Sequence, residues 1–141
     1  MSPHILRRLA PFGFSALLLL TGSLPAAAFT GAAQMEACVA EASVAKPEVR
    51  DPRDFVIYNC STRALVFVYV SPSNDVAWGE DILGKGEWLN PGEYWEVAFN
   101  KRHDGTTCLW DIKVVAADGG EGFVMGRDLC ATNVVTFQDT P

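Results

Sequence analysis

Hydrophobic and polar positions alternate along most of this chain in short runs with a period of two. Such alternation is typical of β-strands with one buried face. In the stretch from residue 93 to residue 99, Trp95, Val97 and Phe99 share one face, and Tyr94 and Glu96 lie on the other. The pattern predicts six or seven short strands, six of which have definite ranges. They are Phe55–Tyr58, Leu65–Val70, Glu93–Phe99, Cys108–Val114, Gly122–Met125 and Val134–Phe137.

Turn-forming residues separate these strands and predict how consecutive strands connect. The polar stretch 59–63 suits a hairpin between the first two strands. A long connection, residues 71–86, is dense in Ser, Pro, Asn, Asp and Gly. Shorter reversals are expected at 90–92, 100–106 and 118–120.

The pattern changes upstream of the strands. Residues 31–45 are rich in Ala and place Met35, Cys38, Val39 and Ala42 at helical spacing. A short helix is predicted here, with Thr30 as its N-cap. A linker from Pro47 to Pro52 follows, so residues 29–52 form a helix and linker, and residues 53–141 form the β domain.

The first 28 residues read as a cleavable signal peptide. Arg7 and Arg8 supply a positive start, an apolar run follows from residue 12 to residue 24, and Pro25-Ala26-Ala27-Ala28 provides a small-residue cleavage site. A transmembrane helix needs ~20 apolar residues, and this run is shorter and interrupted. We therefore expect export, with no stable membrane span after cleavage.

The net negative charge of the chain limits the kinds of molecule that it is expected to bind. The whole chain has a net charge of −6, and removing the signal takes away Arg7 and Arg8 but no acid, which leaves −8. An acidic domain without a basic stripe repels phosphate backbones, so nucleic acid is not an expected partner.

The four cysteines, Cys38, Cys60, Cys108 and Cys130, all follow the signal. An even number in an exported chain predicts two disulfides. Three pairings are possible, and we favour Cys38–Cys60 and Cys108–Cys130 because each joins neighbours in chain order at the same separation. Zinc ligands come in close pairs such as C-x-x-C, which the chain lacks.

These observations predict a mainly β fold, an antiparallel β-sandwich or small barrel with a short N-terminal helix and two disulfides. The chain has four tryptophans. Trp95 and Trp110 lie on the faces assigned to the core, and a buried aromatic contributes much of the burial energy of a small domain. Trp78 and Trp88 fall near loops, where a carbohydrate-stacking platform is the alternative to a core role.

Six ordered blocks in the chain form a recognisable series. They are Y-V-S-P from Tyr69, W-G-x-D-x-L-G from Trp78, L-x-P-G-E from Leu89, C-x-W-D-I from Cys108, D-G at Asp118, and D-L-C from Asp128. The series resembles an uncharacterised family of small secreted bacterial β-domain proteins. Members sometimes carry the name argininosuccinate lyase, which is implausible for this chain because those lyases are large helical tetramers. Cys108 and Cys130 match the two cysteines of the family, which favours their pairing. Cys38 and Cys60 are additions to the family pattern.

Catalytic constellations are weak in this sequence. His103, beside Asp104, is the one histidine after the signal, and a His-Asp-Gly tract in a polar loop is more often turn chemistry than general acid–base machinery. No G-x-S-x-G, H-E-x-x-H or P-loop pattern occurs. We expect no enzyme activity and no cofactor.

The connection 71–86 is the best candidate for binding. Asp75, Glu80 and Asp81 offer oxygen ligands of the kind that Ca²⁺ prefers, with Trp78 nearby, but the spacing matches no EF-hand. The structural interpretation has Asp75 capping a short helical run from Val76 to Leu83, and has Ile82 and Leu83 closing one end of the sandwich. The sequence thus favours an exported interaction or structural module that contacts an envelope or extracellular protein or glycan. A calcium- or small-ligand-binding domain that uses residues 71–86 is the alternative.

Overall fold

The structure, a computed structural model, describes residues 31–100, 102 and 104–140. The predicted signal peptide, Thr30 and His103 lie outside the described residues. One helix precedes six strands: α1 (Gly31–Val44), β1 (Phe55–Asn59), β2 (Leu65–Pro72), β3 (Tyr94–Val97), β4 (Leu109–Ala116), β5 (Glu121–Asp128) and β6 (Val134–Phe137). The predicted helix and all six predicted strands are confirmed.

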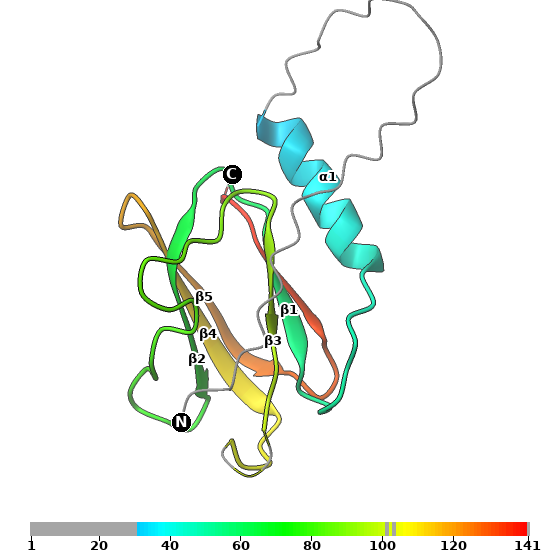
Figure 1. Cartoon of the computed structure of the whole chain (residues 1–141), viewed down its shortest axis with the longest axis vertical. Helices are drawn as coiled ribbons and strands as arrows, with labels where there is room; N and C mark the ends of the chain where they lie inside the picture. Colours follow the sequence, from blue (N-terminus) through cyan, green and yellow to red (C-terminus); the bar gives the residue numbers. More distant parts are fainter. Residues whose placement is uncertain (1–30, 101, 103, 141) are drawn as a thin grey trace, which may run out of the picture.

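The strands form two three-stranded sheets, which Figure 1 shows face to face with α1 on the outer side of one of them. The first sheet has the order β3-β1-β6, and the second has the order β2-β4-β5. The predicted sandwich class is therefore confirmed. All pairs are antiparallel except β1 with β6, which run parallel, so the first sheet is mixed.

The hairpin predicted at residues 59–63 is wrong. β1 and β2 belong to different sheets, so the connection crosses the sandwich instead of closing a pair. Asn59, which is fully buried, explains the crossing. Its side-chain amide donates to the carbonyls of Arg63 and Leu89 at 2.8 Å each, and its Oδ1 accepts from the Ser61 hydroxyl at 2.6 Å. These bonds satisfy the polar backbone of the crossing.

The core lies between the two sheets and contains the faces that the alternation assigned inward. Trp95, Val97 and Phe99 are buried, as are Trp110, Ile112 and Val114. The rings of Phe99 and Trp110 meet edge to face, with centroids 4.8 Å apart. The core interpretation of Trp95 and Trp110 is confirmed, whereas Trp88 is exposed.

Both favoured disulfides are present, Cys38–Cys60 and Cys108–Cys130. The first joins α1 to the end of β1, and the second joins the residues that flank the β4–β5 hairpin. Helix α1 buries only Cys38 and Ala42, which pack on Val56 and Tyr58 of β1. α1 therefore covers the outer face of this sheet with few buried contacts, and the Cys38–Cys60 disulfide holds it in place.

A buried polar cluster joins the end of the linker to the residues that follow β3. The Arg53 guanidinium donates to both Asp51 carboxylate oxygens, at 2.9 and 3.1 Å, and lies 4.8 Å from the centre of the Phe99 ring. The carboxylate of Asp54 accepts the backbone N–H groups of Asp51 and Phe99. The linker thus enters the domain through a network of buried charges, which the sequence pattern did not reveal.

Candidate interaction surface

The outer side of the β2-β4-β5 sheet carries aromatic side chains that do not reach the core. Alternation sends Phe67 and Tyr69 of β2, Lys113 of β4 and Phe123 of β5 to this side. The register puts Tyr69 opposite Lys113, and Lys113 opposite Phe123, so these three form one row across the sheet. We call these four residues, together with Met125 and Trp78, the aromatic face.

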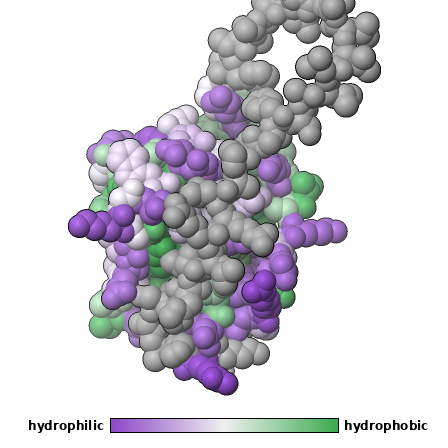
Figure 2. All heavy atoms as spheres, viewed as in Figure 1, coloured by the Kyte–Doolittle hydropathy of each residue, from purple (hydrophilic) through white to green (hydrophobic). Residues whose placement is uncertain are grey.

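Exposed large hydrophobic side chains gather on this side. Among the described residues eight are exposed, and four of them point outward from this one sheet: Phe67 (44%), Leu109 (50%), Phe123 (51%) and Met125 (62%). The other four, Val44, Val49, Val76 and Trp88, lie outside the strands, and in the view of Figure 2 smaller hydrophobic areas lie among hydrophilic side chains. Isolated exposed apolar residues are ordinary, but a contiguous group marks a contact surface.

The rings contact one another and a central cation. The Phe67 and Tyr69 centroids lie 6.2 Å apart, as do those of Trp78 and Phe123. The Lys113 ammonium lies 6.0 Å from the Tyr69 centroid and 5.6 Å from that of Phe123, and it pairs with Glu121 at 2.6 Å. Lys113 therefore fills the space between the rings, and its charge is already balanced.

The connection 71–86 brings Trp78 to this surface. Asp81 forms a bridge with Tyr69, and its Oδ1 accepts the N–H groups of Val68 (2.9 Å) and Leu83 (3.2 Å). The Gly79 N–H donates to the Ser71 hydroxyl at 2.8 Å. These bonds hold the connection along the edge of β2 and place the Trp78 ring beside Phe123.

The helical run predicted for residues 76–83 is wrong, because the structure has no helix there. Asp75 is exposed, and its backbone N–H closes a turn onto the Pro72 carbonyl. The burial of Ile82 and Leu83 is confirmed. Asp81 supplies the anchoring that the sequence assigned to Asp75.

The candidate calcium ligands do not converge. Among the described residues, only Cys108, Asp128 and Cys130 form a group of three potential ligands within metal-binding reach of one another, so Asp75, Glu80 and Asp81 form no such group. The sulfurs of Cys108 and Cys130 form a disulfide with each other, so they are not thiolate ligands. Glu80 is exposed but has an interaction of its own.

Asp104, which the sequence paired with His103, is buried and has a structural role. Its Oδ2 accepts the Asn100 N–H at 2.6 Å, and its backbone carbonyl accepts from Arg53 at 2.9 Å. Its Oδ1 has no hydrogen-bond partner among the described residues. Asp111 of β4 is also hydrogen-bonded, and its carboxylate accepts from the Ser73 hydroxyl and the Gly126 N–H.

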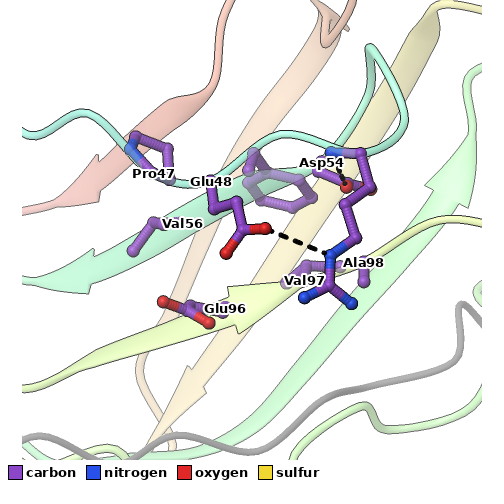
Figure 3. Close-up of a pocket in the computed structure, with 9 residues that line it drawn as sticks. Pro47, Glu48, Asp54, Val56, Glu96, Val97 and Ala98 are labelled. Carbon is purple, nitrogen blue, oxygen red and sulfur yellow. Dashed lines mark hydrogen bonds and ion pairs between the residues drawn. The ribbon is translucent and has the colours of Figure 1, made fainter.

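Two hollows lie away from the aromatic face. Figure 3 shows one of about 90 Å³ beside β1 and β3, where Glu48 points toward Arg50 and Asp54 lies at the rim. Asp54 already accepts backbone N–H groups and Glu48 pairs with Arg50, which leaves the Glu96 carboxylate as a further polar group of the lining. The other hollow, of about 490 Å³, lies beside the start of α1, and none of the described residues that line it is charged. Neither hollow combines an apolar pocket with convergent polar groups, as ligand sites usually do.

The shifted acids belong to an exposed cluster at the β1–β2 connection. Hydrogen bonds from Thr62, and secondarily the charge of Arg63, lower the pKa of Asp139 below its usual 3.8. The Gly120 N–H, followed by Arg63, lowers the pKa of Asp118 in the same way. Burial raises the pKa of Tyr58 under α1, and the nearby Glu41 adds to the effect. None of these groups lies on the aromatic face.

Sequence reasoning identified Trp78 as a candidate but missed Phe67, Tyr69, Lys113 and Phe123. The sequence did contain a sign of this surface. In residues 65–70 the side chains on both faces of the strand are apolar, whereas a sandwich strand needs only one apolar face.

Among the residues that the structure describes, no helix has both the length and the apolar character needed to cross a membrane. The comparisons with protein-family models, with curated proteins and with solved structures found no match to this chain.

Proposed function

We propose that this protein is an exported, non-enzymatic interaction module that contacts a partner protein through its aromatic face. The observation that carries the proposal is the gathering of exposed Phe67, Phe123 and Met125, with Trp78 and Tyr69, on one side of one sheet. Aromatic residues and Met are enriched at protein interfaces, where they supply much of the binding energy.

The shape of the surface favours a protein over a glycan. The Trp78 and Phe123 rings are tilted by 41° to each other, so they offer no common plane for a sugar ring. A broad, gently irregular apolar surface suits complementary packing by another protein.

A non-catalytic role is supported by the bonds that the polar side chains near the face already make. Lys113 pairs with Glu121, Asp81 accepts two backbone N–H groups, and Asp111 accepts from Ser73 and Gly126. General acid–base chemistry needs a group placed to exchange a proton with a substrate. These groups instead hold the strands and the connection in place.

Two disulfides indicate an oxidising, extracytoplasmic environment. We propose that residues 1–28 direct the chain there and are removed, and that the product is periplasmic or secreted. Mass spectrometry of the natural product would find Phe29 as the first residue. A product that retains Met1 and four free thiols would contradict export.

Capture from an envelope fraction tests the aromatic face. The mature, oxidised protein is compared with Phe123→Ser/Met125→Ser and with Val44→Ser, in which an even more exposed apolar residue, on α1, changes. We expect one discrete protein to be retained by the natural sequence and by Val44→Ser, with at least tenfold less retained by the double variant. Equal retention by all three, or binding that requires only glycan, would contradict the proposal.

A further inference from the structure

β5 is an edge strand that is open to pairing. It ends the order β2-β4-β5, so within the described residues only one of its two edges pairs with a strand. Edge strands present unpaired N–H and C=O groups to any chain that can align beside them. At eight residues, β5 is twice as long as β3 and β6, the edge strands of the other sheet.

The hydrogen bonding fixes which groups face outward. Ala116 N–H donates to the Gly120 carbonyl at 2.7 Å, so these two residues form a hydrogen-bonded pair at the hairpin end. Such pairs recur every second residue in an antiparallel ladder. With Val114 opposite Gly122 and Ile112 opposite Val124, the backbone groups of Gly122 and Val124 face β4. The N–H and C=O groups of Glu121 and Phe123 therefore face the open edge.

The middle of this edge lacks the charges and prolines that protect many edge strands, although Glu121 and Arg127 flank it. Residues 122–126 read Gly-Phe-Val-Met-Gly, with no charge and no proline. A register shift opposite Asp111 ends regular pairing near Gly126, so the regular part of the edge runs from Glu121 to Met125. Phe123 and Met125 are exposed there and belong to the aromatic face.

We propose that β5 accepts an extended, basic segment of a partner protein as a fourth strand of this sheet. The inference rests on the proposed function and specifies how the partner docks. Backbone bonds to Glu121 and Phe123 would set the register, and every second partner side chain would lie beside the aromatic face. An apolar residue at those positions packs on Phe123 and Met125.

Charge selects the partner. The chain after residue 28 carries nine Lys and Arg (11 less Arg7 and Arg8) against 17 Asp and Glu, a net charge of −8. A second copy of this chain would bring the same negative charge to the edge, which disfavours self-pairing. A segment flanked by Lys or Arg is attracted instead. The occupant is therefore a basic, alternating segment of another protein.

Amide hydrogen exchange tests this docking in the unmodified protein. The probe is a nine-residue peptide that alternates valine and threonine between two lysines at each end. We expect the Phe123 amide to exchange at least tenfold more slowly with saturating peptide. The Gly122 and Val124 amides, already bonded to β4, should change little. An otherwise identical peptide with glutamates at its ends should bind at least tenfold more weakly.

A pair of variants separates the backbone contribution from the side chain. Phe123→Ala removes the ring and keeps the outward N–H, whereas Phe123→Pro removes both without breaking a bond to β4. We expect peptide binding at least tenfold weaker for Phe123→Pro than for Phe123→Ala. Should Phe123→Pro fail to fold, the exchange measurement on the natural sequence decides the matter.

Three outcomes would overturn the inference: an unprotected Phe123 amide at saturating peptide, equal binding of the lysine and glutamate peptides, or a dimer whose formation protects Phe123. If the aromatic face still captures a protein while the Phe123 amide stays unprotected in that complex, strand addition fails and the proposed function stands. If the Phe123→Ser/Met125→Ser variant captured the partner as well as the natural sequence does, the proposed function itself would be contradicted.

Discussion

Arg53 illustrates what a residue contributes when its charge is buried. Its side chain is 3% exposed and donates to Asp51 and to the Asp104 carbonyl. The alternating pattern placed it at the start of the domain, beside an assumed linker, because charged residues are ordinarily exposed. Its burial depends on Asp104, 51 residues away in the chain, and on the Phe99 ring. A contact of that range leaves no local signal in the sequence.

We predict that Arg53→Met destabilises the domain by about 3–5 kcal/mol, because the buried Asp51 carboxylate would lose the guanidinium that balances its charge. Arg53→Lys should also destabilise it, since an ammonium cannot reproduce the two-pronged contact. Urea unfolding measures both. Arg50→Ala is the control, because its pair with Glu48 is exposed and should be worth less than about 1 kcal/mol. Equal midpoints for Arg53→Met and Arg50→Ala would contradict the structural role.

Asp139 provides a prediction about pH. Hydrogen bonds from the Thr62 side chain and backbone N–H lower its pKa below 3.8, and Arg63 contributes less. A lowered folded-state pKa adds stability above the unfolded pKa, and this stability is lost as the pH falls through the folded value. NMR titration of the carboxyl carbon should therefore show a midpoint below 3.8. Thr62→Ala should raise this midpoint more than Arg63→Met does. The reverse order would show that Arg63, through its own hydrogen bond and its charge, lowers the pKa of Asp139 more than the Thr62 hydroxyl does.

At the scale of elements, alternation located every strand, but it did not determine which strands pair. A period of two reports that one face is buried, whichever neighbour supplies the hydrogen bonds. Residues 59–63 were predicted to form a hairpin because polar residues separate two apolar runs. In the structure this segment crosses from one sheet to the other, and the buried Asn59 side chain donates hydrogen bonds to the backbone carbonyls of Arg63 and Leu89 there. β1 pairs in parallel with β6, which lies near the other end of the sequence. A local sequence pattern cannot reveal a pairing between strands so far apart in the chain.

The connection 71–86 distinguishes an anchoring acid from an exposed one. Asp81→Ala should destabilise the domain by about 1–3 kcal/mol, because the N–H groups of Val68 and Leu83 would lose their acceptor. Asp75→Ala should change stability by less than about 0.5 kcal/mol, since Asp75 is exposed. Thermal melts should coincide in calcium and in chelator for the natural sequence. A rise of several degrees in calcium that both substitutions abolish would instead support the cation-binding alternative.

At the scale of the whole molecule, the two disulfides account for a large share of the net stability. Each bridge closes a loop of sequence separation 22, which corresponds to about 3 kcal/mol in the loop-closure model. A domain of this size is stable by only about 5–15 kcal/mol. Losing both bridges therefore removes a large part of the total, which ties folding to an oxidising compartment.

Removing one disulfide or the other should affect different parts of the structure. Cys38→Ser/Cys60→Ser frees α1, whose only buried residues are Cys38 and Ala42, so helical circular dichroism should fall while the core tryptophans keep their folded fluorescence. Cys108→Ser/Cys130→Ser leaves the β4–β5 hairpin closed by its own ladder, so the helix signal should persist as the urea midpoint drops. The quadruple variant should be largely unfolded at 37 °C. If it kept the natural midpoint, the core between the two sheets would be sufficient alone, and the disulfides would no longer tie this fold to the compartment proposed for it.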